Sequence, residues 1–200
     1  VAVSVGNTGV SDEAAPGTVT GVTFGGTPMT LVSAVHSGVA VRSYIYRLLN
    51  PTASPSANVV VTIGTKTSGV IASATTFNNV NQSTPLGTAQ TFLANGGDYF
   101  VAGNVTSAVG ELIFSTSAVD EYVNVQQGIS ANAGQTELWN NSGFNFVSGA
   151  SSTIDGASSV YIRYNMLDYE DGCIAAVSIK PAASSTLVSN PNITAVLKYG

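Results

Sequence analysis

The feature that most constrains this fold is a succession of short apolar segments separated by turns. Segments such as VAVSV (1–5), NVVVTI (58–63) and CIAAVSI (173–179) are bounded by Gly, Pro, Asn and Ser at spacings of about 8–12 residues. We find no segment with the apolar period and caps of a helix. The pattern therefore predicts an all-β protein, specifically a jelly-roll-like two-sheet antiparallel β-sandwich.

Glycine-containing turns predict which strands are neighbours. Gly25 and Gly26 separate residues 18–24 from 28–36. Asn95 and Gly96 similarly separate residues 88–94 from 98–106. Because such dipeptides favour tight two-strand turns, we expect each flanking pair to form a β-hairpin.

The chain carries very little charge. Charged residues are 8% of the 200 residues, and the net charge is −5, whereas an ordinary soluble domain has about 25% charged residues. Such a surface gives little repulsion between copies, which favours an ordered assembly. The six scattered Lys and Arg residues argue against nucleic acid as a partner, and the apolar runs are too short to span a membrane.

Residues for catalysis are scarce. The single histidine, His36, lies beside a predicted turn, and the sequence has no zinc-protease, P-loop or nucleophile-elbow motif. Cys173 starts an apolar run, so we expect a buried, unreactive thiol, with an interchain disulfide as the alternative. We predict that the protein is not an enzyme and binds no cofactor.

An acidic cluster is the one candidate for a metal site. Asp168, Glu170 and Asp171 lie close together before the last strand of the sandwich. Carboxylates can hold Ca²⁺ or hydrolyse glycosides, but these lack the alternating spacing of a calcium loop. A solvated turn with no metal is the favoured interpretation.

Aromatic residues and sequons suggest contact with sugars. Tyr44 and Tyr46 share one strand face and would form an exposed platform for surface glycans, although packing in a core or interface is the favoured interpretation. Trp139 is expected in the core. Sequons for N-glycosylation occur at Asn81, Asn104, Asn140 and Asn192. Asn, Ser and Thr are abundant enough for chance to give about this many.

Several segments, taken in order, resemble a known family. They are VTGVTFGGTPMTLV, YIYRLLNP, NNVNQSTPL, GQTELWN and AAVSIKPA. Together they are similar to a jelly-roll-like β-sandwich module that recurs in phage virion proteins and exported bacterial or archaeal surface proteins. The resemblance covers about residues 1–183 and implies a sandwich without catalytic residues. Compared with that family, the chain has one strand fewer at its front and one more at its end.

The extra strand at the end suggests how copies might join. We expect a sandwich domain over 1–183 and an extension over 184–200, in which Ile193, Ala195, Leu197 and Tyr199 form one apolar face. Donated to a second copy, this face would fill a groove whose rim we assign to Val1, Val3 and Val5. Self-completion of its own sheet, an unrelated role for the tail, and exchange of the amino-terminal strand are the alternatives.

These patterns predict a structural protein outside the cell. It would be a filament subunit whose partners are copies of itself, joined head-to-tail by β-strand donation. A virion component, such as a capsid decoration or tail-fibre module, and a carbohydrate-binding module are the alternatives.

Overall fold

The computed structural model contains strands and no helix in the part of the chain that it describes. That part comprises residues 2–6, 17–37, 41–51, 57–64, 69–94, 99–120, 128–141, 147–167, 171–183 and 188–197. Side chains are not described for residues 2, 3, 6 and 188–197. All strand pairs are antiparallel. The all-β prediction is confirmed.

The strands form four sheets, which we number in the order in which they stack. Sheet I contains β3 (Thr27–Pro28), β2 (Val19–Phe24) and β6 (Val59–Ile63). Sheet II contains β16 (Val188–Leu197), β7 (Gly69–Asn78), β1 (Ala2–Gly6), β5 (Val41–Arg47) and β4 (Thr30–Ser37). Sheet III contains β12 (Thr136–Asn141), β13 (Val147–Asp155), β10 (Leu112–Asp120), β15 (Gly172–Ile179) and β8 (Gln90–Ala94). Sheet IV contains β11 (Ile129–Ala131), β14 (Val160–Met166) and β9 (Phe100–Val105).

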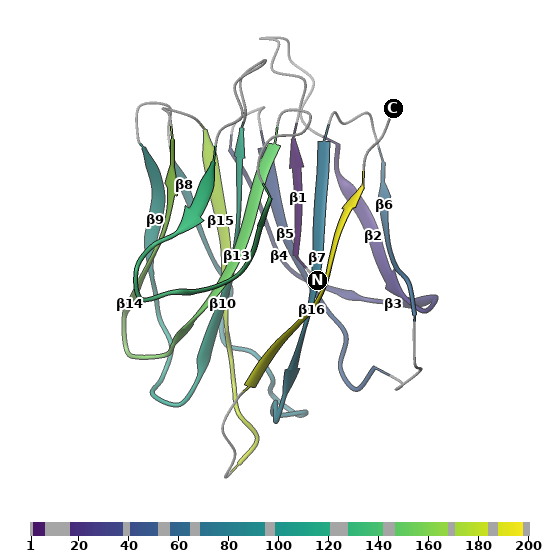
Figure 1. Ribbon diagram of the computed structural model, residues 1–200. Coiled ribbons are helices and arrows are strands. Elements are labelled where there is room, and N and C mark those ends of the chain that lie inside the picture. The colour runs from purple at the N-terminus through teal and green to yellow at the C-terminus, as the bar shows by residue number, and fades with distance from the viewer. Residues whose placement is uncertain are drawn as a thin grey trace.

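The sheets lie face to face as successive layers (Figure 1). One apolar cluster, including Val22 and Tyr46, joins sheets I and II. A second, including Ile45 and Phe114, joins sheets II and III. A third, including Ile113 and Tyr164, joins sheets III and IV. Sheets II and III are therefore internal layers, and strands such as β15 are buried along their whole length.

Small residues allow the two internal sheets to pack closely. Ser4 Oγ donates a hydrogen bond to the Ser117 carbonyl of the facing sheet at 3.1 Å, and Ser43 Oγ donates to the Thr116 carbonyl at 3.4 Å. A Cβ at Gly149 would come within 3.2 Å of both Ser4 and Trp139. These contacts explain why the inner strands are rich in Ser, Ala and Gly, since larger side chains would separate the layers.

The arrangement of strands differs from the prediction in two respects. The predicted sandwich had two sheets, whereas the structure has four, and its strand order does not establish a jelly roll. The hairpin expected around Asn95 is wrong, because β8 pairs with β15 in sheet III while β9 pairs with β14 in sheet IV. That connection crosses between layers. The hairpin expected around Gly25 and Gly26 forms only in part. Both glycines have positive φ and join β2 to the two-residue β3, but most of the expected partner segment is β4, which pairs with β5 in sheet II.

Candidate functional site

The carboxyl-terminal strand lies at one edge of sheet II. β16 pairs with β7 of its own chain, from Val188 opposite Asn78 to Leu197 opposite Val70. The register shifts between Pro191 and Ile193. Proline has no backbone N–H to donate, so Pro191 suits an edge strand. The backbone of Ile193, Ala195 and Leu197 therefore lies at the edge of sheet II, beside β7. Tyr199 lies outside the described residues.

The amino-terminal strand lies inside the same sheet. β1 pairs with β5 on one side and with β7 on the other, so β7 separates it from β16 (Figure 1). Val5 is fully buried in the cluster between sheets I and II. Val3 lies in β1, and Val1 is outside the described residues. Val3 and Val5 thus lie on a central strand of sheet II, and their role at the rim of an acceptor groove stays a prediction.

A cavity of about 480 Å³ opens where β1 begins. β1 reaches Ile45 on β5 and Ser73 on β7, but β5 continues to Arg47 and β7 to Asn78. Beyond Ala2, no strand that the structure describes separates these two. Both bordering stretches, Ile45–Arg47 and Ala74–Asn78, line the cavity. We call this gap the strand slot.

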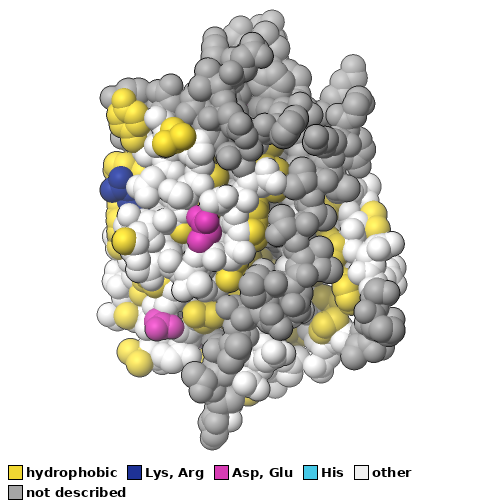
Figure 2. Space-filling view, in the orientation of Figure 1, with side chains coloured by type: hydrophobic (Ala, Val, Ile, Leu, Met, Phe, Trp, Pro, Cys, Tyr) yellow, Lys and Arg dark blue, Asp and Glu magenta, His cyan; other side chains and the backbone are white. Residues whose placement is uncertain are grey.

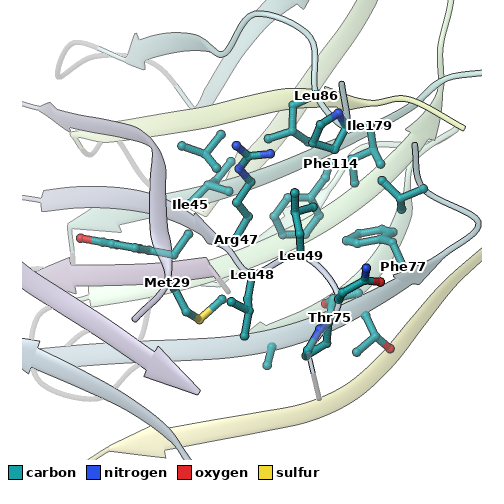
Figure 3. Close-up of a pocket in the computed structure, with 18 of the residues that line it drawn as sticks. Met29, Ile45, Arg47, Leu48, Leu49, Thr75, Phe77, Leu86, Phe114 and Ile179 are labelled. Carbon is teal, nitrogen blue, oxygen red and sulfur yellow. The ribbon is translucent and has the colours of Figure 1, made fainter. Parts of the chain in front are cut away.

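The strand slot passes through sheet II from one face to the other. Phe24, Met29 and Val59 line it from the side of sheet I, whereas Phe114, Val177 and Ile179 line it from sheet III. Figure 3 shows Met29 and Leu48 toward one side, and Leu86, Phe114 and Ile179 toward the opposite one. The rings of Phe77 and Phe114 meet edge to face with centroids 5.5 Å apart. The walls are thus mainly apolar both toward sheet I and toward sheet III.

The slot also contains one cationic side chain. Arg47, at the end of β5, is partly buried, and its guanidinium lies among the apolar side chains of the cavity (Figure 3). It forms no ion pair with any acidic side chain within the described ranges. A guanidinium offers five N–H donors, so it is able to bind carbonyl or carboxylate oxygens of an incoming group.

The predicted tyrosine platform is not formed. Tyr44 and Tyr46 are 5% and 6% exposed, and both pack between sheets I and II. Burial, followed by the neighbouring Tyr44, raises the pKa of Tyr46 above its usual value. The expectation that these rings present a flat surface to sugars is therefore wrong, and the favoured interpretation of core packing is confirmed. Trp139 is also in the core, as predicted.

The candidates for chemistry remain isolated. Cys173 is a buried free cysteine, as predicted, and burial raises its pKa to about 12. His36 lies on β4 with an exposed side chain. Asp171 is partly buried, while Asp168 and Glu170 lie outside the described residues. Within the described ranges, no three His, Cys, Asp or Glu residues gather as metal ligands.

The sequons differ in accessibility. Asn104 and Asn140 are exposed, but the Asn140 amide donates a 2.7 Å hydrogen bond to Glu137 Oε1. Asn81 Oδ1 accepts hydrogen bonds from the backbone N–H groups of Ser83 and Thr84. The side chain of Asn192 is not described. Asn104, on β9, is therefore the sequon best placed for modification.

One buried polar cluster was not anticipated from the sequence. The Tyr164 hydroxyl lies 2.9 Å from Ser115 Oγ and 2.8 Å from Ser152 Oγ, between sheets III and IV. Gln135 Nε2 donates to Ser152 Oγ at 2.7 Å. Burial raises the pKa of Tyr164 well above its usual value, so the hydroxyl stays protonated. Its role is to hydrogen-bond the two buried serine hydroxyls.

The sequence also did not predict the strand slot, because the slot depends on which residues of β5 and β7 lie opposite the start of β1. Nothing in the sequence alone showed that residues 2–6 and 69–78 pair.

Comparisons with protein-family models, with curated proteins and with solved structures found no match for the chain. The resemblance to the virion and surface-protein module therefore remains a prediction beyond the shared β-sandwich character. In the part of the chain that the structure describes, no helix has the length and apolar character needed to cross a membrane.

Proposed function

We propose that this protein is a structural subunit of an extracellular filament, in which copies join head-to-tail by donating their carboxyl-terminal strand. The observation that carries the proposal is the place of β16. It is the last strand of the sequence, it lies at a sheet edge, and it pairs with β7 alone. A strand so placed can leave without taking apart the interior of the sheet.

Exchange between copies needs no new kind of contact. The pairing that β16 makes with β7 of its own chain can be made in the same register with another chain, as in domain swapping. Backbone hydrogen bonds would supply affinity and direction, while alternate side chains would supply specificity. When each copy gives its strand to a third copy and not back to its own donor, the contact repeats head-to-tail without closing.

The uncharged surface supports assembly. Among the described residues of the face in Figure 2, the few acidic and basic side chains are isolated spots between uncharged ones. With 8% charged residues and a net charge of −5, approaching copies meet little repulsion.

Removal of residues 186–200 tests the proposal. The full-length protein should form long thin filaments by negative-stain electron microscopy, and the truncated protein should form none. Adding a synthetic 186–200 peptide should restore the melting transition of the truncated subunit without restoring filaments, because each subunit is then capped.

A truncated protein that still forms normal filaments would refute strand donation. Rings or closed particles from the full-length protein would instead favour the virion alternative. A full-length protein that stays monomeric at high concentration would count against any assembly role.

A further inference from the structure

We infer that the outer face of sheet IV binds an acidic carbohydrate, specifically a chain of uronic acids. Tyr161 supplies a ring on which one sugar stacks, Arg163 binds a sugar carboxylate, and the Asn104 amide binds hydroxyl groups. This face contains neither β16 nor β7, so the inference goes beyond the proposed function and does not depend on it.

The alternation of side chains along the strands decides which residues reach this face. Val101 and Val105 of β9, and Ile162 and Tyr164 of β14, are buried in the cluster between sheets III and IV. The residues between them therefore point to the opposite side, away from the other three sheets (Figure 1). They are Phe100, Ala102, Asn104, Tyr161, Arg163 and Asn165.

An exposed ring and an exposed amide lie side by side on this face. Tyr161 and Asn104 are directly opposite each other on the paired strands β14 and β9. The Tyr161 side chain is 49% exposed, and Asn104 is also exposed. A tyrosine ring has a flat apolar face and a polar hydroxyl at its edge. A sugar ring can lay its C–H groups on that face while its hydroxyls reach the neighbouring amide.

The guanidinium of Arg163 is held in place before any ligand arrives. Its Cζ lies 4.1 Å from the centroid of the Phe100 ring, and its Nε donates a 2.7 Å hydrogen bond to Asn165 Oδ1. These contacts use one face of the guanidinium and one of its N–H groups. The N–H groups on its two Nη atoms are in the geometry that binds a carboxylate at two points. Because the side chain is already ordered, binding costs little further entropy.

The charge of this face selects an acidic sugar over a neutral one. Arg163 is the only charged residue in the three strands of sheet IV, β9, β11 and β14. The Glu137 carboxylate, which reaches β11, accepts hydrogen bonds from the Ala131 backbone N–H and from Asn140 Nδ2. A uronic acid brings a carboxylate to the guanidinium, whereas a neutral sugar does not. An anion without sugar rings, in turn, makes no use of Tyr161.

The spacing of the groups suits a chain of sugars more than a single one. Tyr161 and Arg163 are two residues apart on one strand, so their side chains leave the sheet about 7 Å apart. Asn165 follows at the next outward position of β14, and Asn104 lies across from Tyr161. The polar and aromatic groups therefore form a line along β14 that an extended oligosaccharide can follow.

Calorimetric titration of the full-length protein tests the inference. The probe is tetragalacturonate, a chain of four uronic acids, and the control is its methyl ester, in which the carboxylates are neutral. Production in a host without N-glycosylation leaves Asn104 unmodified. We expect saturable binding of tetragalacturonate, at least about tenfold tighter than binding of the ester. Binding should weaken as NaCl is added, because salt screens the exposed charges.

Variants with matched controls locate the binding. Tyr161→Ala should weaken it at least about tenfold, and Tyr161→Phe should recover most of that loss because it keeps the ring. Arg163→Gln should remove the preference for the acid over the ester. Val60→Ala, at a 52% exposed position of sheet I, and Lys180→Gln, just after β15, should leave the affinity unchanged. Circular dichroism and melting temperature confirm that each variant folds.

Other outcomes overturn the inference in distinguishable ways. Equal binding of the acid and its ester would exclude selection by charge. Equal affinity for inorganic phosphate would make the face a general anion site. No binding of either sugar would exclude a carbohydrate site, and filaments lost in Tyr161→Ala would then identify the face as a contact between copies. In every case the truncation of residues 186–200 still decides strand donation separately.

Discussion

At the scale of single residues, one group of buried polar side chains is held together by mutual hydrogen bonds. The Tyr164 hydroxyl, Ser115 and Ser152 form a closed set of hydrogen bonds between two sheets. Such a cluster stabilises only when every member is satisfied, because each unpaired buried group costs about 1–3 kcal/mol. Removing one member should therefore matter more than removing an exposed hydroxyl.

Tyr164→Phe tests this directly. Loss of the hydroxyl leaves two serines short of a partner, and we expect the free energy of unfolding to fall by about 1–3 kcal/mol. Tyr161→Phe, three residues away with a side chain 49% exposed, is the matched control and should change it by less than about 0.5 kcal/mol. Equal stability of the two variants in urea unfolding would show that the cluster contributes nothing.

Cys173 predicts a loss of stability at alkaline pH. Burial raises the pKa of its thiol to about 12, compared with about 8.5 in an unfolded chain. Between these values the unfolded state releases a proton that the folded state keeps, so stability is complete below about pH 8.5 and falls as pH rises toward 12.

The slope should reach up to about 1.4 kcal/mol per pH unit for this group. Cys173→Ala should flatten the decline in melting temperature between pH 8 and 10.5. Part of what remains reports on Tyr164 and Tyr46, whose pKa values are also raised. A decline that is identical in both proteins would exclude the thiol as its cause.

At the scale of elements, small residues set the distance between the two internal sheets, II and III. Gly149→Ala should destabilise the protein by about 1–3 kcal/mol, because its Cβ would lie 2.7 Å from Ser4 Oγ and 3.0 Å from Ser4 Cβ. Gly21→Ala is the control, since a Cβ there meets nothing within 4 Å. Chemical unfolding of both variants measures the difference in the free energy of unfolding. A Gly149→Ala protein as stable as the control would mean that sheets II and III can shift enough to accept the added methyl group.

Strand identity was predictable from the sequence, but strand partnership was not. Alternation and turn residues located most strands, including β5 and β15. β8 and β9, on either side of Asn95 and Gly96 in the sequence, nevertheless belong to different sheets. Burial of both faces of sheet III decides their partners, and local turn preference does not. The slot likewise depends on Ala2 of β1 lying opposite Ser73, which is a matter of long-range register.

At the scale of the whole molecule, chain order follows the layers with one exception. The strands before Val80 build sheets I and II, and those from Gln90 to Ile179 build sheets III and IV. β16 then returns to sheet II. β16 lies at the edge of that sheet, and it is the strand that the proposed exchange would move.

Assembly by such a strand should be insensitive to salt. The association would depend on apolar burial and backbone hydrogen bonds, whereas the 17 charged residues among 200 provide few ion pairs to screen. We expect the sedimentable fraction of filaments to be the same in 20 mM and in 1 M NaCl, to within about twofold. Guanidinium chloride should dissolve them at concentrations where equal NaCl does not, since it solvates both apolar and peptide groups. Filaments that fall apart in 1 M NaCl would instead place the contacts on charged surfaces, such as those around Glu111 or Asp155, and would count against a donated strand.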